Sequence, residues 1–565
     1  MNPADIAAAI ERALLDLPAL AATPLPGPVW LVLRDGGRRV ASGWREPAPL
    51  DAILKSLWCG LDVPFDIIEL FAAEARRPVE TALPPMALSD ERGILGLEAR
   101  FGDLVERIAP TTMIARNWGF VRAQEQLLQA LHTDLSSFRA GGGKFALLSG
   151  QQAVAVLDPE TGVRVHPVFR GQRTVSPKEV DAARAREVAA GMADWLRRHL
   201  QDSGRLIYSW HMSRGKEGVG DNAIRRFMAT VALRRIAAWT GAASDAETAS
   251  RNLAFNFAQT YREDADGVGH IALQGSAKLG AMALAALAAL EIGGDNQFTA
   301  QRAGLTRGID ALSLPNGRFR TFLYPEGRAD DNQNFYSGEA LLYWAHLHRH
   351  DREALPAERF YHHADHYKVH FRKAPNPAFV PWHTMARCMM LETEAVRNSD
   401  SVDFVFAMND WLLPMQQWET APYPDLRGRF YDPQRPQFGP PHASSTGVYL
   451  EGLVKAWRLA RWIGDEKRAT TYAVAIRRGI RSLSQLQIRI NDAETDLWYV
   501  TKRSHAYGGL RTTEWDNRIR VDNVQHGLMA LLDLMGVPGD SAALFDSPQA
   551  SEAEAQAAGS RRARQ

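Results

Sequence analysis

The last two thirds of the chain alternate between two kinds of helical pattern. Stretches that are apolar on nearly every face follow polar, aromatic-rich loops, and more charged amphipathic stretches come next. The clearest apolar stretches are AKLGAMALAALAALEIGG (277–294), ALLYWAHLHRH (340–350) and GVYLEGLVKAWRLARWIGD (447–465). A helix that is apolar all round must be buried on all sides. The alternation therefore predicts a double ring, in which outer helices wrap inner ones and the loops before the inner helices gather at one end.

The first 175 residues show a different, mixed pattern. β-rich runs flank Asp35-Gly36-Gly37, β-branched residues are dense after Phe65, and Gly141-Gly142-Gly143 interrupts the chain. Such runs and turn residues indicate strands and hairpins, whereas amphipathic spacing indicates helices. In chain order, these patterns predict a hairpin at 29–44, a helix at 50–61, a strand at 65–73, a helix at 124–138 and a β-meander that turns at 158–162.

The expected fold class is multidomain α+β, because a chain of 565 residues is too long for one ordinary core. Helical patterns begin at Ser176-Pro177-Lys178-Glu179, a good helix N-terminus. The predicted parts are an N-terminal α/β domain of unknown role (1–140), a β-meander or linker (141–175), an (α/α)6-type helical toroid (176–537) and a disordered tail (538–565).

The composition argues against several classes of function. Lys and Arg (66) nearly balance Asp and Glu (65), so no overall field would attract nucleic acid. No apolar run reaches the ~18 residues that suggest a membrane span. Cys59 and Cys388 lie far apart, which excludes a disulfide framework and a thiolate metal site. We expect a cytoplasmic protein that binds neither nucleic acid nor membrane, with homodimer formation left open.

Three segments resemble the six-hairpin, or (α/α)6-toroid, carbohydrate enzymes. They are LPNGRFRTFLYPEG (314–327), NFYSGEALLYWAHLH (334–348) and STGVYLEGLVKAWRLARWIGDEKR (445–468), the last followed by RSLSQLQIR (481–489). This group includes N-acylglucosamine 2-epimerases, unsaturated-glucuronyl hydrolases and the helical domain of glucuronyl C5-epimerases. The resemblance covers about residues 180–537 and implies the toroid fold and chemistry on a sugar.

Two glutamates at inner helices are candidate catalytic groups. Glu339 lies beside Tyr336 at a helix start, where it would act as general acid or base; alternatively it only stabilises the first helical turn. Glu451 either faces the cavity from an inner helix or forms an exposed pair with Lys455 at i, i+4.

Aromatic and basic residues of the loops are candidate sugar ligands. The Trp382-His383 and Asp410-Trp411 pairs would stack on a sugar ring and bond its hydroxyls, with His383 and Asp410 as catalytic candidates. The alternative is that the tryptophans fill the core. His442 is a further expected contact. Arg320 and Arg429, together with Arg427 and Arg511, could hold a carboxylate in a bidentate pair.

Asp522 and His526 are spaced i, i+4 and share a helix face. They would form either a proton shuttle or, as we favour, a buried structural hydrogen bond. Together with Trp382, Trp411, His442, Arg320 and Arg429 they complete the predicted substrate-binding set.

No cofactor is expected. Seven of the 16 histidines lie between His346 and His370, and two pairs on 362–370 have the spacing of helical metal ligands. Their segment also carries Lys and Arg and is typical of a solvated outer helix, so we expect no metal. Nucleotide-binding and kinase motifs do not occur in the sequence.

The sequence therefore predicts a carbohydrate-active enzyme, an epimerase or glycoside hydrolase. It would act on a small-molecule or oligosaccharide substrate containing a uronic acid or amino sugar. The alternative is a non-catalytic toroid that binds a glycan or peptide partner, since fold alone does not determine function.

Overall fold

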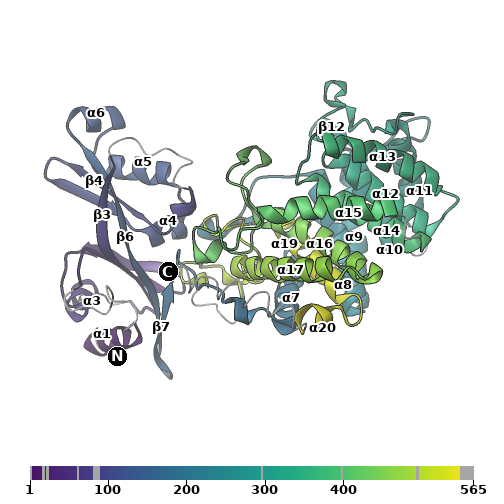
Figure 1. Cartoon of the computed structure of the whole chain (residues 1–565). Coiled ribbons are helices and arrows are strands. Elements are labelled where there is room, and N and C mark those ends of the chain that lie inside the picture. Colours follow the sequence, from purple (N-terminus) through teal and green to yellow (C-terminus); the bar gives the residue numbers. More distant parts are fainter. Residues whose placement is uncertain are drawn as a thin grey trace.

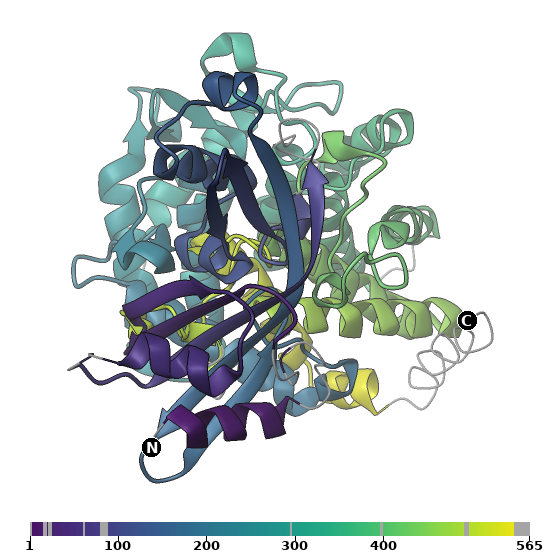
Figure 2. The same ribbon diagram turned by 90° about the vertical axis from the view of Figure 1, so that its left-hand side faces the viewer.

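The computed structural model describes residues 3–14, 20, 25–59, 61, 63–79, 89–293, 297–395, 399–490 and 496–546. An antiparallel sheet with a few helices forms the N-terminal part, and a large array of helices forms the rest (Figure 1). Seen along the perpendicular direction, the long strands of the sheet lie across one side of the helical part (Figure 2).

The N-terminal sheet has the strand order β2-β1-β3-β6-β4-β5, and β7 pairs with β6 beside this path. Every pairing is antiparallel. The predicted hairpin at 29–44 and the strand after Phe65 are confirmed. The strands are β1 (Val29–Asp35), β2 (Arg38–Arg45), β3 (Ile67–Val79), β4 (Gly96–Phe101), β5 (Leu104–Ile108), β6 (Lys144–Asp158) and β7 (Gly162–Val168).

The segment 141–175 is not a separate meander, which corrects the expectation from the sequence. Strand β6 pairs with β3 along most of its length and also with β4 and β7, so it belongs to the middle of the sheet. Its buried residues, such as Ala153 and Val154, contribute to the same cores as β3. Sequence spacing does not reveal such long-range pairing, because each strand needs a partner but does not specify which one.

Five helices of the described residues pack on this sheet. The helix predicted at 50–61 is present, whereas the one predicted at 124–138 is split, because the side chain of Asp134 caps a new helix by accepting from the backbone N–H of Ser137. The helices are α1 (Pro3–Ala13), α3 (Leu50–Trp58), α4 (Pro110–Arg116), α5 (Phe120–Ala130) and α6 (Leu135–Ala140).

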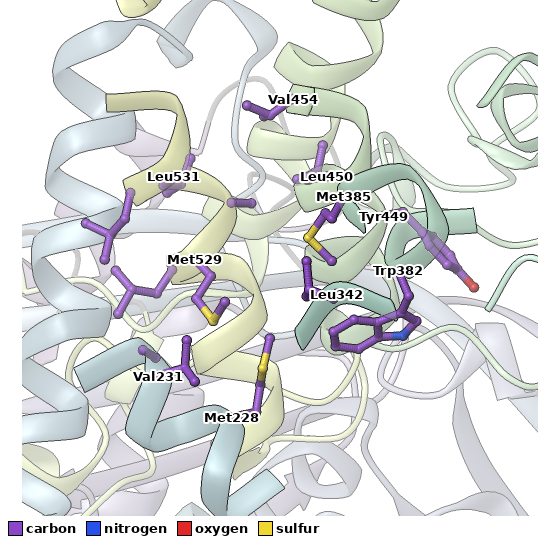
Figure 3. Packing of buried hydrophobic residues seen from close by; sticks show 14 of the residues in the cluster. Met228, Val231, Leu342, Trp382, Met385, Tyr449, Leu450, Val454, Met529 and Leu531 are labelled. Atoms are coloured by element: carbon purple, nitrogen blue, oxygen red, sulfur yellow. The ribbon is translucent and has the colours of Figure 1, made fainter. Parts of the chain in front are cut away.

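Six helices form a closed inner ring in the helical part. Each packs against the next, and the last, α19, packs against the first, α8. Side chains from several of these helices meet inside the ring (Figure 3). The inner helices are α8 (Ala223–Thr240), α10 (Leu279–Ile292), α12 (Tyr336–His350), α14 (Phe379–Glu394), α16 (Ala443–Ile463) and α19 (Val521–Met535).

Six further helices surround this ring, one against each inner helix. The pairs are α7 with α19, α8 with α9, α10 with α11, α12 with α13, α14 with α15, and α16 with α17. The predicted alternation of inner and outer helices is thus present as a toroid. The outer helices are α7 (Ala182–His199), α9 (Ala243–Thr260), α11 (Thr299–Leu312), α13 (Ala357–Lys373), α15 (Ser399–Leu412) and α17 (Glu466–Leu486).

Small residues let the inner helices approach closely. Gly447 of α16 faces Gly527 of α19, where an added Cβ would lie 2.6 Å from the backbone nitrogen of Gly527. Gly452 meets Pro381 of α14 in the same way, with 2.9 Å to its Cα. Alanine does the same for α10, whose residues 279–289 are all buried. Such contacts explain why small residues are frequent where inner helices pack against one another.

Short strands lead the chain into inner helices. In the three-stranded sheet β14-β8-β9, strand β14 is followed directly by α19. In the four-stranded sheet β10-β11-β12-β13, strand β12 is followed directly by α10. The strands are β8 (Ser209–His211), β9 (Lys216–Glu217), β10 (Tyr261–Glu263), β11 (Gly269–Leu273), β12 (Ser276–Lys278), β13 (Phe322–Tyr324) and β14 (Arg518–Arg520).

The ends of the helical part differ in detail from the prediction. The capping box at Ser176 is present but closes one 3-10 turn, and α7 begins at Ala182 after the N-cap Asp181. Helix α20 (Asp540–Phe545) occupies the start of the expected disordered tail. It is helical because the buried Asp540 accepts from Arg458 and Arg461 of α16. Residues 547–565 lie outside the described part.

Polar contacts join the sheet to the helical ring. The buried Arg170 donates from Nε to Asp425 at 2.7 Å, and Asn117 Nδ2 donates to Asp516 at 2.9 Å. The division into domains stays a prediction. Within the described residues, no helix has the length and apolar character needed to cross a membrane.

Candidate active site

A cavity of about 350 Å³ lies at the N-terminal ends of the inner helices. Residues from α8, α12, α14, α16 and α19 line it, and the loop before α16 adds residues from 430 to 442. The loops that enter inner helices therefore line a cavity, and its role as the functional site stays a prediction. The lining includes Arg225, Phe335, Tyr336, Glu339, Trp382, Phe430, Asp432, Phe438, His442, Tyr449, Asp522, Gln525 and His526.

Glu339 is a buried acid on the cavity wall. It lies in the first turn of α12 with 2 % of its surface exposed, and its Oε2 has no hydrogen-bond partner in the described part of the chain. Burial raises its pKa to about 8, and Lys278 opposes this only in part. The group is therefore largely protonated at neutral pH and can donate a proton.

Tyr336 lies one turn before Glu339 and also lines the cavity. Burial and the neighbouring Glu339 both raise the pKa of its phenol. Its ring packs against Phe322 with centroids 5.7 Å apart. Tyr336 therefore stays a neutral phenol that can hydrogen-bond a hydroxyl group.

His526 and Glu451 form a hydrogen-bonded pair across α19 and α16. The Nδ1 of His526 lies 2.7 Å from Oε1 of Glu451. His526 lines the cavity, whereas Glu451 is 2 % exposed and lies behind it. Burial raises the pKa of Glu451, although His526 opposes this. When Glu451 is ionised, Nδ1 donates to it and leaves Nε2 as a proton acceptor, so the pair has the geometry of an oriented general base.

Asp522 does not pair with His526, contrary to both readings of the i, i+4 spacing. Arg520 donates from Nε to Asp522 at 2.9 Å, and the Nε of Arg225 lies 2.9 Å from its Oδ2. Despite burial, hydrogen bonds and charge from these arginines lower the pKa of Asp522 to about 2. Asp522 is thus an ionised wall residue, and Arg225, beside it in the cavity, was not among the predicted residues.

His442 is the N-cap of α16 and lines the cavity. Its Nδ1 accepts from the backbone N–H of Ser445 at 3.1 Å. Burial lowers its pKa to about 4, so the imidazole is neutral. Because Nδ1 is an acceptor, the proton resides on Nε2, which makes His442 a hydrogen-bond donor.

Aromatic residues supply much of the remaining wall. Trp382 is 4 % exposed and meets His526 edge to face, with centroids 6.0 Å apart. Phe335, 42 % exposed, and Phe438 of the long loop also contribute. Such rings bind the apolar faces of sugars while the neighbouring polar groups bond the hydroxyls.

Three predicted residues lie outside the cavity. Asp410 is near the end of the outer helix α15 and accepts from Tyr472 at 2.6 Å and Arg468 at 3.0 Å, both on α17. The expectation that it lines the cavity is wrong, because its segment forms an outer helix. Trp411 packs behind Phe438. His383 is fully buried and stacks on Phe379 at 3.5 Å, and burial lowers its pKa well below the usual value.

Arg320 and Arg429 also lie away from the cavity. Arg320 follows a bridge between Ser313 and Phe319. The buried Arg429 donates to Gln417 at 2.7 Å and to Asp90 at 3.2 Å, where the ring meets the sheet part of the chain. Arg429 therefore holds the two parts together and does not line the ring cavity.

The histidine-rich segment has ordinary hydrogen bonds. His362 bonds the carbonyl of Pro315, His363 bonds Ser313 and His348 bonds Glu394. Within the residues that the structure describes, no group of three or more His, Cys, Asp or Glu side chains is placed to hold a metal ion.

Arg225, Gln525 and Phe430 are cavity residues that the sequence analysis did not identify. Arg225 lies in the first turn of α8, as Glu339 does in α12. The expectation that the starts of inner helices line the cavity therefore applies to Arg225 as well. The sequence did not indicate α8 as an inner helix, because its Arg-Arg pairs interrupt the apolar pattern of an otherwise buried helix.

No family model and no curated protein matches the chain. Solved structures do match, over about 62 % of the chain. An unsaturated glucuronyl hydrolase specific for heparin has 13 % identity and a TM-score of 0.43, covering 62 % of this chain and 96 % of its own. A sugar epimerase from a ruminal bacterium has 10 % identity and a TM-score of 0.46, covering 63 % and 99 %. The cellobiose 2-epimerase from Bacillus thermoamylovorans B4167 has 11 % and 0.45, covering 62 % and 98 %. These are carbohydrate-active epimerases and hydrolases, the classes that the sequence resembles.

Proposed function

We propose that the protein is a carbohydrate-active enzyme that moves protons on a sugar held in the ring cavity, most simply as an epimerase. The observation that carries this proposal is the presence of a proton donor and a proton acceptor in one cavity. Glu339 is largely protonated at neutral pH, and His526 is oriented as a proton acceptor when Glu451 is ionised. An acid and a base on the wall of one cavity are what proton transfer at a carbon requires.

In this mechanism Nε2 of His526 takes a proton from the carbon next to the sugar carbonyl. The electron pair moves to the carbonyl oxygen, which becomes an enolate, and the Arg225 guanidinium stabilises that charge. Glu339 then returns a proton to the opposite face of the carbon while the carbonyl re-forms. The imidazolium and carboxylate exchange protons with water before the next turnover.

Glycoside hydrolysis is the second candidate, and a specific observation favours it. Glu339 and Asp522 line the same cavity, with pKa values of about 8 and about 2. Two carboxyl groups in opposite protonation states are the combination that glycosidases use. Epimerisation is placed first because Asp522 is held by two arginines, which makes it a weak base toward water.

A uronic acid or amino sugar remains the proposed substrate class. Arg225 supports the acidic sugar, since it lines the cavity and a guanidinium binds carboxylates in a bidentate fashion. The non-catalytic alternative from the sequence analysis predicts sugar binding without turnover.

The test is incubation of the full chain with reducing sugars and acidic oligosaccharides in deuterated water. Deuterium at a sugar carbon indicates epimerisation, and new reducing ends without carbon-bound deuterium indicate hydrolysis. Glu339→Gln should lower either activity about 10²- to 10⁴-fold. Glu358→Gln in the first turn of the outer helix α13 is the matched control and should leave activity intact. Binding with neither product would contradict both enzymatic proposals.

A further inference from the structure

A second cavity lies where the sheet part of the chain meets the ring. It has a volume of about 290 Å³ and opens between the end of α4 and the 3-10 turn Met212–Arg214. We call it the basic cleft. Its lining is Arg116, Asn117, Trp118, Arg122, His211, Ser213, Arg214 and Asn517. A smaller cavity of about 170 Å³ shares Arg116 and Ser213 with it and adds Arg34, Arg38 and Arg39.

The positive charge in this region is not neutralised. Among the described residues, the side chains of Arg39, Arg116 and Arg214 have no ion pair or hydrogen bond, and the lining of both cavities contains no Asp or Glu. Although Arg116 is exposed, partial desolvation and the like charges of Arg39 and Arg34 lower its pKa. A bound anion would relieve this repulsion.

Nearby carboxylates are already engaged by other groups. Asp516 accepts from Asn117 and Arg518, and Glu69 accepts from Arg34. Outside the cleft, exposed pairs join Glu125 to Arg122 and Asp35 to Arg38. These four acids account for part of the arginine charge but leave Arg39, Arg116 and Arg214 without counter-charges.

Hydrogen bonds between distant segments fix the walls of the cleft. Asn517 Nδ2 donates to the carbonyl of Ile114 at 2.7 Å and to Ser213 Oγ at 2.9 Å. Beside these bonds, Asn117 Nδ2 donates to Asp516, and the backbone N–H of Asn517 donates to Asn117 Oδ1. The pKa of His211 is lowered by burial, Arg518 and Arg214, so this imidazole is neutral and adds hydrogen-bonding capacity. The cleft is therefore preorganised, which lowers the cost of binding.

We propose that the basic cleft binds an oxyanion group, a carboxylate or sulfate, of an acidic oligosaccharide. The forked guanidinium groups of Arg116 and Arg214 would hold the oxyanion, and Trp118 supplies a ring face for the sugar. That the ligand is a sugar rests on the proposed function of the ring cavity.

Strand β14 connects the two sites. Its residue Arg518 pairs with His211 of the cleft, and Arg520 holds Asp522 of the ring cavity. Because strand residues advance about 3.3 Å each, Asn517 and Val521 lie roughly 13 Å apart along the chain. A separation of this size is within the span of a few linked sugar units.

The experiment is calorimetric titration of the full-length protein with a hexamer of galacturonic acid, a heparin-derived hexasaccharide and neutral maltohexaose. The acidic hexamers should bind more tightly than maltohexaose and weaken as salt is raised. Arg116→Ala combined with Arg214→Ala should raise the Kd for an acidic hexamer about tenfold or more. Both arginines are exposed and unpaired, so this variant should keep the melting temperature of the parent.

Two matched variants separate the specific site from general charge. Arg139→Ala with Arg372→Ala removes two exposed arginines from α6 and α13 and should leave the Kd unchanged. Arg116→Lys with Arg214→Lys keeps the charge and should recover only part of the affinity, since lysine lacks the fork.

Equal Kd values for the alanine variant and its control would overturn the proposal, as would tighter binding of single-stranded DNA than of either acidic hexamer. Glu339→Gln should retain acidic-hexamer binding in the cleft. If no sugar is turned over but binding still depends on Arg116 and Arg214, the proposed enzymatic function fails and the cleft assignment stands.

Discussion

The carboxyl group of Glu339 in α12 packs against the backbone of Gly280 in α10, in space that any side chain at position 280 would fill. The same added atom would also approach Tyr336 at 2.8 Å. The absence of a side chain at Gly280 therefore sets where the proposed acid lies. It is a contact between two helices that are far apart in sequence.

Gly280→Ala should impair activity more than stability. Alanine favours a helix over glycine by about 1 kcal/mol, which offsets part of the strain. The new methyl group displaces the Glu339 carboxyl, so kcat should fall at least about tenfold, with the melting temperature measured alongside. Gly119→Ala, where an added Cβ meets nothing within 4 Å, is the control. Full activity in Gly280→Ala would contradict the placement of Glu339.

Glu339→Gln should change how stability depends on pH. The pKa of Glu339 in the folded protein, about 8, is above its ordinary value of 4.5, so the folded state binds this proton more tightly than the unfolded chain. The associated stability is complete below pH 4.5 and is lost as pH rises to about 8. Relative to Glu339→Gln, the parent should therefore lose on the order of a few kcal/mol between pH 5 and 9. Parallel denaturant curves would contradict the raised pKa.

Glu451 should act through His526 as a positioning residue. Glu451→Gln and His526→Asn should each reduce kcat with less effect on KM. Because both changes disable one unit, the double variant should be little worse than His526→Asn alone. Additive losses in a kinetic double-mutant cycle would show that the two residues act separately. Lys455→Met is the control for effects on stability. Lys455 lies on α16, as Glu451 does, and donates to Asp533 of α19.

Asp522→Asn should destabilise the protein mainly at neutral pH. The folded pKa of Asp522, about 2, is below the ordinary 3.8, so its stabilisation is present above pH 3.8 and is lost as pH falls to about 2. At pH 7 the variant should lose about 2 kcal/mol, because Arg225 and Arg520 lose their counter-charge. Urea unfolding at pH 7 and pH 3 measures the difference. An equal deficit at both values would refute the ion-pair origin.

Chelation should leave the protein unchanged. In the described residues, the side chains that could bind a metal do not form a set of three. The melting temperature and any measured activity should be the same with and without EDTA, and elemental analysis should find far less than one zinc ion per chain. A stoichiometric zinc ion that is lost together with activity would contradict this expectation and direct attention to His362 and His366.

The sequence by itself determined the ring of helices and which ends of them would border a cavity. Apolar positions around the whole of α10 and α12 require burial on every side, which only an inner position provides. Tyr336 and Trp382 lie in the first turns of α12 and α14, and His442 is the N-cap of α16; all three line the cavity. Local periodicity sufficed here because burial is a property of each helix.

Tertiary structure alone decided which distant side chains pair with one another. Asp522 and His526 share a helix face, yet Asp522 binds Arg520 and Arg225 of α8, whereas His526 binds Glu451 of α16. Asp410 resembled a cavity residue in the sequence but faces α17. The basic cleft arises where α4 meets a turn about 100 residues later. Pairings between distant segments depend on packing angles and register, which one-dimensional spacing does not encode.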